Sequence, residues 1–172
     1  MKSKTLNTLS YTGVVTLSRY IGSKKVELTK IHNSGTLALF DFLADCFIGA
    51  FTDAEDKRPT KIKVLNRTVT PDGVTSYTSA SGFVHLLTTP EKVFNEKANQ
   101  IFVRYSFLVP RDIINNIANT KGLALGLYAK KALKNEENTE DFSAVCNIDS
   151  IKDLSTNTSL VVDWELAITN SK

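Results

Sequence analysis

The chain has 172 residues, of which 42% are hydrophobic and 23% are charged, as is typical of one globular domain with a full core. This composition excludes a chain that is disordered throughout, because such chains combine low hydrophobicity with high net charge. The formal net charge is only +3, and the 21 basic residues are interleaved with 18 acidic ones. We therefore do not expect the concentrated basic face on which nucleic-acid binding depends.

Neither a secretory signal nor a membrane span is evident in the sequence. The basic start is not followed by the continuous apolar stretch of a signal peptide. The most apolar segment, residues 37–51, contains Asp41 and Asp45 and is shorter than the roughly 20 residues of a transmembrane helix. The cysteines, Cys46 and Cys146, lie in apolar patterns without a disulfide framework. We expect two reduced, buried thiols in a protein made in the cytoplasm of its host.

Alternation of apolar and polar residues predicts about eight β-strands, since successive side chains of a strand point to opposite faces of its sheet. The first two strands flank Gly22-Ser23 and predict a β-hairpin. The predicted strands are residues 14–20, 25–31, 61–65, 83–88, 100–109, 123–128, 142–148 and 160–169. The connecting segments predict a turn at Pro71-Asp72-Gly73, a loop or edge strand at 76–81, a loop or short helical turn at 90–99, a segment compatible with a short helix at 112–119, and an acidic loop at 134–141.

One α-helix is predicted at about residues 35–51. Ser34 and Thr36 are candidates for its N-cap, because their hydroxyls can accept hydrogen bonds from the first helical N–H groups. Apolar side chains surround most of this helix, and only Asp41 and Asp45 form a polar stripe. We therefore expect a helix that is buried on several sides, under a sheet or between a sheet and a neighbouring subunit.

The order of these elements predicts a single, mostly-β domain over residues 1–172. Eight strands separated by turn signals are typical of an antiparallel β-sandwich, here jelly-roll-like, with one α-helix inserted after the first hairpin. Regular alternation of strands and helices, which a doubly wound α/β fold requires, is missing. The last strand has the clearest pattern, because apolar residues alternate with polar ones on either side of Trp164. We expect one face of that strand to lie in the core.

No constellation of catalytic or metal-ligating residues stands out. His32 and His85 are the only histidines, and neither has a nucleophile or further zinc ligands at local spacing. The segment 122–126, Gly-Leu-Ala-Leu-Gly, lacks the Gly-Lys-Ser/Thr ending of a phosphate-binding loop and fits a strand instead. We therefore expect a protein that is not an enzyme, with no catalytic residue, no metal site and no cofactor.

Five residues are candidate assembly contacts. Asp41 and Asp45 lie four residues apart, so their carboxylates share one face of the predicted helix. A solvated or ion-paired face is the simplest interpretation, an intersubunit contact the next, and acid–base chemistry the last. Phe102 and Leu108 point away from the better core face of their strand, and Val161 does so in the last strand. A domain with one helix has too little material to cover both sheets, so oligomerisation would supply the rest.

The layout of the chain carries a resemblance to a known class of proteins. It consists of a hairpin at 14–31, a helix with an Asn- and Thr-containing start at 33–51, a strand after a proline at 59–66, a Gly-Leu-Tyr stretch at 125–129 and a Trp-bearing strand at 159–169. This order resembles that of small structural proteins of tailed-bacteriophage virions, found in necks, tails, baseplates and head attachments. The resemblance implies a β-sandwich with multimeric contacts and no catalysis. It implies a place in the virion, copies of itself and neighbouring virion proteins as partners, no small-molecule substrate and no membrane.

A carbohydrate- or receptor-binding β-sandwich of a fibre is the alternative. Such sites present exposed aromatic rings beside polar side chains, and Tyr77, Tyr128 and Trp164 are the rings available for one. The alternating pattern of the last strand assigns Trp164 to the core face, which favours the structural role.

Overall fold

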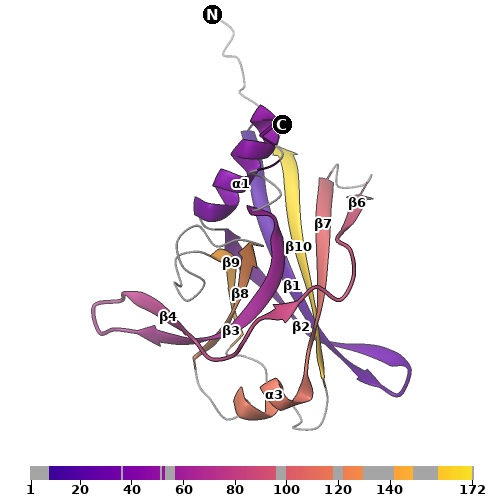
Figure 1. The fold of residues 1–172 in the computed structure, drawn as a ribbon, viewed down its shortest axis with the longest axis vertical. Helices are drawn as coiled ribbons and strands as arrows, with labels where there is room; N and C mark the ends of the chain where they lie inside the picture. The colour runs from indigo at the N-terminus through magenta and orange to yellow at the C-terminus, as the bar shows by residue number, and fades with distance from the viewer. Residues whose placement is uncertain are drawn as a thin grey trace, which may run out of the picture.

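The computed structural model describes residues 8–35, 37–50, 52, 57–95, 100–117, 122–129, 142–148 and 159–171. Strands dominate this part of the chain, and two helices accompany them (Figure 1). In chain order, the elements are β1 (Thr8–Ile21), β2 (Lys24–Gly35), α1 (Leu37–Ile48), β3 (Pro59–Val69), β4 (Thr75–Ser79), β5 (Val84–His85), β6 (Glu91–Asn95), β7 (Gln100–Val109), α3 (Arg111–Ile117), β8 (Leu123–Ala129), β9 (Phe142–Asn147) and β10 (Leu160–Ser171).

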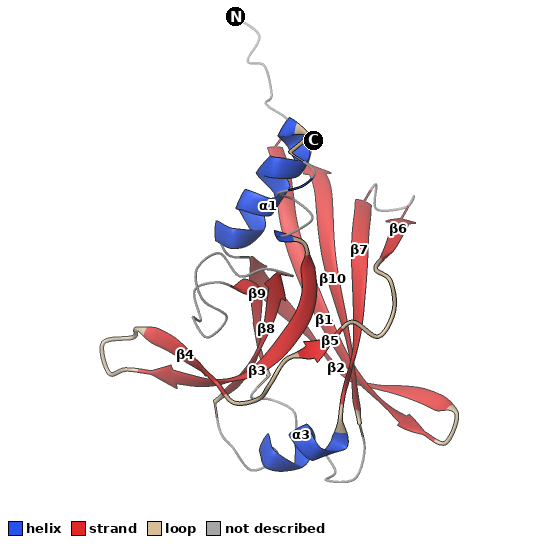
Figure 2. Ribbon diagram, in the orientation of Figure 1, coloured by secondary structure: helices blue, strands red, loops and turns tan. Residues whose placement is uncertain are grey.

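The strands form two antiparallel sheets, which confirms the predicted mostly-β sandwich (Figure 2). Sheet A contains β1, β2, β6, β7 and β10, and sheet B contains β3, β4, β5, β8 and β9. The end of β2 joins the sheets on one side, because Ser34 pairs with Val145 on β9. An isolated bridge between Leu86 and Phe107 joins them on the other side.

The main core fills the space between the inner faces of the two sheets. Alternate residues of the central strands point into it, as the period-two pattern predicted. Its largest fully buried side chains are Trp164, Phe107, Leu17, Leu39, Ile62, Leu125, Leu127, Ile114, Val15, Val64 and Val109. Each such side chain contributes about 1.5–3 kcal/mol through burial. Leu39 of α1 and Ile114 of α3 are part of this core, so both helices pack against the sandwich.

A smaller apolar cluster covers the outer face of sheet B. It consists of Leu65, Ala124, Tyr128 and Phe142, with Tyr77, Phe83 and Val145 packed against them. Ile62 and Val64 of β3 face the main core, and Lys61 and Lys63 face the other way. Both lysines are nevertheless buried, and each ammonium lies about 4 Å from the centre of the Phe83 ring. Attraction between a cation and an aromatic ring offsets part of their desolvation.

Gly122 sits at a position that only glycine fits. Its φ angle is 75°, in the left-handed region that side chains disfavour. An added Cβ would lie 2.5 Å from the carbonyl oxygen of Arg67, and the Arg67 N–H donates to the Gly122 oxygen at 2.5 Å. The glycine therefore lets the start of β8 approach β3 closely.

Several predicted element boundaries were wrong. Ser34 belongs to β2 instead of capping the helix, and the other cap candidate, Thr36, lies outside the described residues. The segment 90–99 was expected to be a loop or a helical turn, but residues 91–95 form strand β6, which pairs with β7. Its cross-strand contacts outweigh its polar composition. The predicted strand at 83–88 is only the two-residue β5, and the acidic loop at 134–141 lies outside the described residues.

The burial expected for Cys46 was wrong, and within the single chain α1 is covered on one side only. Leu39 is buried, but Phe40 is 51% exposed and Ile48 is 78% exposed. The helix rests by one face against β2 and β9, and its opposite face points to solvent. Cys146 is buried as predicted, whereas Cys46 is exposed, because the sandwich covers only one side of this helix. Both thiols are free. Neither described helix is long and apolar enough to cross a membrane.

Candidate functional site

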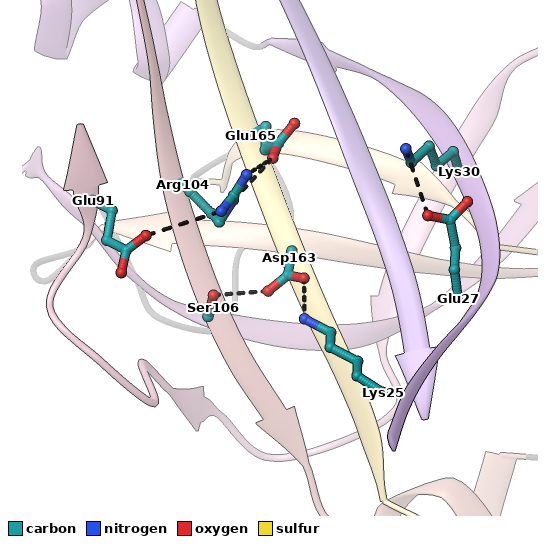
Figure 3. A network of polar contacts seen from close by, with 8 residues as sticks. All are labelled: Lys25, Glu27, Lys30, Glu91, Arg104, Ser106, Asp163 and Glu165. Atoms are coloured by element: carbon teal, nitrogen blue, oxygen red, sulfur yellow. Dashed lines mark hydrogen bonds and ion pairs between the residues drawn. The ribbon is translucent and has the colours of Figure 1, made fainter. Parts of the chain in front are cut away.

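A ladder of charged side chains crosses the outer face of sheet A (Figure 3). Arg104 on β7 lies directly opposite Glu165 on β10 and Glu91 on β6. Its Nη2 and Nε atoms donate to Oε1 of Glu165 at 2.7 and 2.9 Å. Its Nη1 lies 4.0 Å from Oε2 of Glu91. Arg104 therefore ties three neighbouring strands together on the side that faces away from the core.

Asp163 on β10 is the second centre of this face. Its Oδ1 accepts a hydrogen bond from Ser106 on β7 at 2.8 Å, and its Oδ2 lies 2.5 Å from Nζ of Lys25 on β2. The lysine reaches across β1, which lies between β2 and β10. Only 13% of the Asp163 side chain is exposed. Reduced exposure strengthens this pair relative to a surface ion pair, which is worth about 0–1 kcal/mol.

A hollow of about 350 Å³ lies over the ladder, at the small end of the volumes that hold ligands. Its lining residues are Thr16, Ser18, Lys25, Glu27, Lys30, Arg104, Asp163 and Glu165. The three basic and three acidic residues balance, and Glu27 lies 3.5 Å from Lys30. Since the charges of this lining are paired with one another, it suits a neutral polar group better than a net anion or cation.

Asp41 and Asp45 on α1 share one lysine. Nζ of Lys57 lies 2.6 Å from Oδ2 of Asp41 and 2.7 Å from Oδ2 of Asp45. Hydrogen bonds to Asp41 and then to Asp45 raise the pKa of Lys57 above its ordinary value. The two carboxylates thus form an ion-paired face within the chain, the simplest of the alternatives that the sequence left open. The lysine fastens the segment before β3 to the helix.

The other three candidate contacts, Phe102, Leu108 and Val161, lie on the outer face of sheet A, away from Asp41 and Asp45. The guanidinium of Arg104 stacks over the ring of Phe102, 5.7 Å from its centre. Leu108 is 37% exposed, so part of its apolar surface lies in contact with solvent. Val161 is only 3% exposed and has almost no surface to offer in this chain.

The histidines and the glycine-flanked segment carry no constellation of reactive groups. His32 and His85 are exposed and lie on β2 and β5. No group of three or more His, Cys, Asp or Glu side chains is arranged to hold a metal ion, as far as the described residues go. Residues 123–129 form the fully buried strand β8, which confirms that this segment is a strand.

Two hairpins extend beyond the sandwich as arms, which sequence reasoning did not predict, although it predicted the first hairpin and the turn of the second. The first, the β1–β2 arm, is residues 20–25, which continue beyond the last partner of β1 on β10. The second, the β3–β4 arm, is residues 67–77, beyond the last partner of β3 on β8. Figure 1 shows the arms leaving the sandwich in different directions. Each arm carries exposed apolar side chains near its tip, namely Tyr20, Ile21, Val69 and Val74.

A signal for the arms is present in the sequence. Apolar residues flank glycine turns in both, with Ile21 before Gly22 and Val74 after Gly73, and both glycines have positive φ angles. Large apolar residues beside a tight turn indicate a hairpin tip that leaves apolar surface in contact with water. No family model, curated protein or solved structure matches the chain.

Proposed function

We propose that the chain is a non-catalytic structural component of a bacteriophage virion, which assembles with copies of itself and with neighbouring neck, tail or head proteins. The pair of hairpin arms is the observation that carries this proposal. A two-stranded hairpin is marginally stable in water without further support. Each Å² of apolar area that the tips leave in water forgoes about 25 cal/mol of stabilising free energy. A neighbouring subunit that covers the tips removes both costs.

Other surfaces support an assembling protein. Phe40 and Ile48 on α1 and Leu108 on β7 are large apolar side chains exposed outside the arms. The hairpin, helix, post-proline strand and Trp-bearing strand on which the phage resemblance rests correspond to β1–β2, α1, β3 and β10. The proposed place in a virion rests on the resemblance. The proposed self-assembly rests on the exposed apolar surfaces, because a neighbouring copy would remove them from water.

The proposal is tested in two steps. Light scattering on the purified chain, over a hundredfold range of concentration, is expected to give a defined multimer. Antibodies against the chain are then expected to label the virions that are released by the infected cells in which the chain is made. A chain that is monomeric at every concentration and absent from particles contradicts the proposal.

The carbohydrate- or receptor-binding module of a fibre remains a second candidate, favoured by the polar hollow on sheet A. Its lining combines basic hydrogen-bond donors with acidic acceptors, and hydroxyl groups can bond to both. Two of the aromatic rings that such a site would use, Tyr128 and Trp164, are buried instead. Binding on a glycan array that is lost in Asp163→Ala would raise this candidate above the structural one.

A further inference from the structure

The exposed face of α1 presents two parallel ridges. Phe40, Ala44 and Ile48 are spaced four residues apart, and each is exposed, so they form one apolar ridge along the helix. Asp41, whose side chain is 43% exposed, and Asp45, which is 14% exposed, form an acidic ridge beside it. Their shared partner Lys57 leaves this trio with a net charge of −1.

The tip of the β1–β2 arm has the complementary character. Tyr20 and Ile21 are 50% and 57% exposed, and Lys24 follows the turn directly, whereas the next residue, Lys25, is already paired with Asp163. No acidic residue occurs between positions 19 and 25. The β3–β4 arm also has exposed valines, but the tip between them carries Asp72 and no basic residue. Charge therefore distinguishes the arms, and only the β1–β2 arm matches an acidic ridge.

These complementary surfaces lie at opposite ends of the molecule. Figure 1 places α1 at one end of the long axis and the tip of the β1–β2 arm toward the other. Strand β1 runs from the helix end to the tip over 14 residues, which spans roughly 45 Å at about 3.3 Å per residue. A bulge at Leu17/Ser18 in the pairing of β1 with β2 adds twist just before the arm. The two surfaces of one chain therefore cannot meet each other.

We propose that the β1–β2 arm of one copy docks on the exposed face of α1 in the next copy. Tyr20 and Ile21 pack against the ridge of Phe40, Ala44 and Ile48. The contact joins different surfaces, so each copy uses its arm on one neighbour and its helix on the other. Repetition of a head-to-tail contact produces a closed ring or a helical tube. This inference rests on the proposed self-assembly and specifies the partner and the contact.

Disulfide trapping tests the contact directly. Ser23→Cys in the turn and Ala44→Cys on the ridge are combined with Cys46→Ser, which leaves buried Cys146 as the remaining native thiol. Mild oxidation is expected to give a ladder of dimers, trimers and larger species on a non-reducing gel. Mass spectrometry is expected to find peptides that link positions 23 and 44. The matched control replaces Ser23→Cys by Asp72→Cys at the tip of the other arm, and no 72–44 link is expected.

Surface charges provide a second readout. Ile21→Glu and Ile48→Glu are each expected to raise the apparent dissociation constant of the assembly at least about tenfold, because each places a carboxylate in the apolar contact. Leu87→Glu, at an exposed apolar residue outside both arms and α1, is the matched control and is expected to leave assembly unchanged. If the wild-type chain assembles but the cysteine variant gives no 23–44 link, or if Leu87→Glu weakens assembly as much as Ile21→Glu, the docking contact is overturned and the proposed function stands. A wild-type chain that stays monomeric at all concentrations overturns both.

Discussion

Phe107→Ala tests the assignment of the two faces of β7, on which the sandwich and its outer ladder depend. Phe107 is fully buried in the main core, and its backbone bridges to Leu86 where the sheets meet. Burial of roughly 150 Å² at about 25 cal/mol per Å² gives about 4 kcal/mol for the ring. This value agrees with the usual loss of about 3–5 kcal/mol for Phe→Ala in a core. The loss is a large part of the roughly 5–15 kcal/mol that stabilises a domain.

Leu108→Ala is the matched control, since Leu108 is the next residue on the same strand and points to the opposite face. At 37% exposure, its truncation is expected to lower the free energy of unfolding by no more than about 1 kcal/mol. Urea titration followed by the fluorescence of Trp164, the only tryptophan and fully buried, measures both values. Equal losses, or a larger loss for Leu108→Ala, would refute the assignment of faces.

Three further predictions concern single residues. Gly122→Ala is expected to lower the free energy of unfolding by more than about 2 kcal/mol, because a positive φ and a backbone clash coincide there; Gly73→Ala, with the same sign of φ but open space, should lose only about 1 kcal/mol in the same urea assay. A thiol reagent at about pH 8.5 is expected to modify Cys46 but not Cys146 in the folded chain, since burial raises the pKa of Cys146 to about 12; two thiols reacting at equal rates would contradict this. The raised pKa of Lys57 means that its ion pairs stabilise the fold below the ordinary lysine value of 10.5 and are lost as the pH rises through the folded value. The urea midpoint of the wild type should therefore fall more steeply in alkali than that of Lys57→Met, and parallel curves would exclude a role of these pairs in stability.

The sequence is sufficient to predict the sandwich because its central strands have strict period-two patterns. The residues of β7 and β10 alternate as expected, with Phe107, Val162 and Trp164 inside and Arg104 and Asp163 outside. Strand β6 could not be found this way, since most of its residues are exposed and its pairing with β7 defines it. Edge strands depend on a neighbour more than on their own composition.

The burial of α1 was beyond the reach of the hydrophobic pattern. A helix that is apolar nearly all round predicts burial on several sides, yet Phe40 and Ile48 face solvent in the single chain. The hydrophobic pattern cannot show whether an apolar helix face packs against the core of its own chain or against another subunit, because both surfaces are apolar. The polar ladder was missed for a related reason, since Lys25 meets Asp163 only through the order of strands β2, β1 and β10.

The mass of the chain in solution, measured by light scattering across concentration, tests the central claim most directly. The account predicts that the wild type forms a defined multimer and that Ile21→Glu dissociates it, while Leu87→Glu does not. A wild-type chain that remains monomeric at every concentration, with a mass of 19.0 kDa, would contradict the claim that this protein builds an assembly from copies of itself.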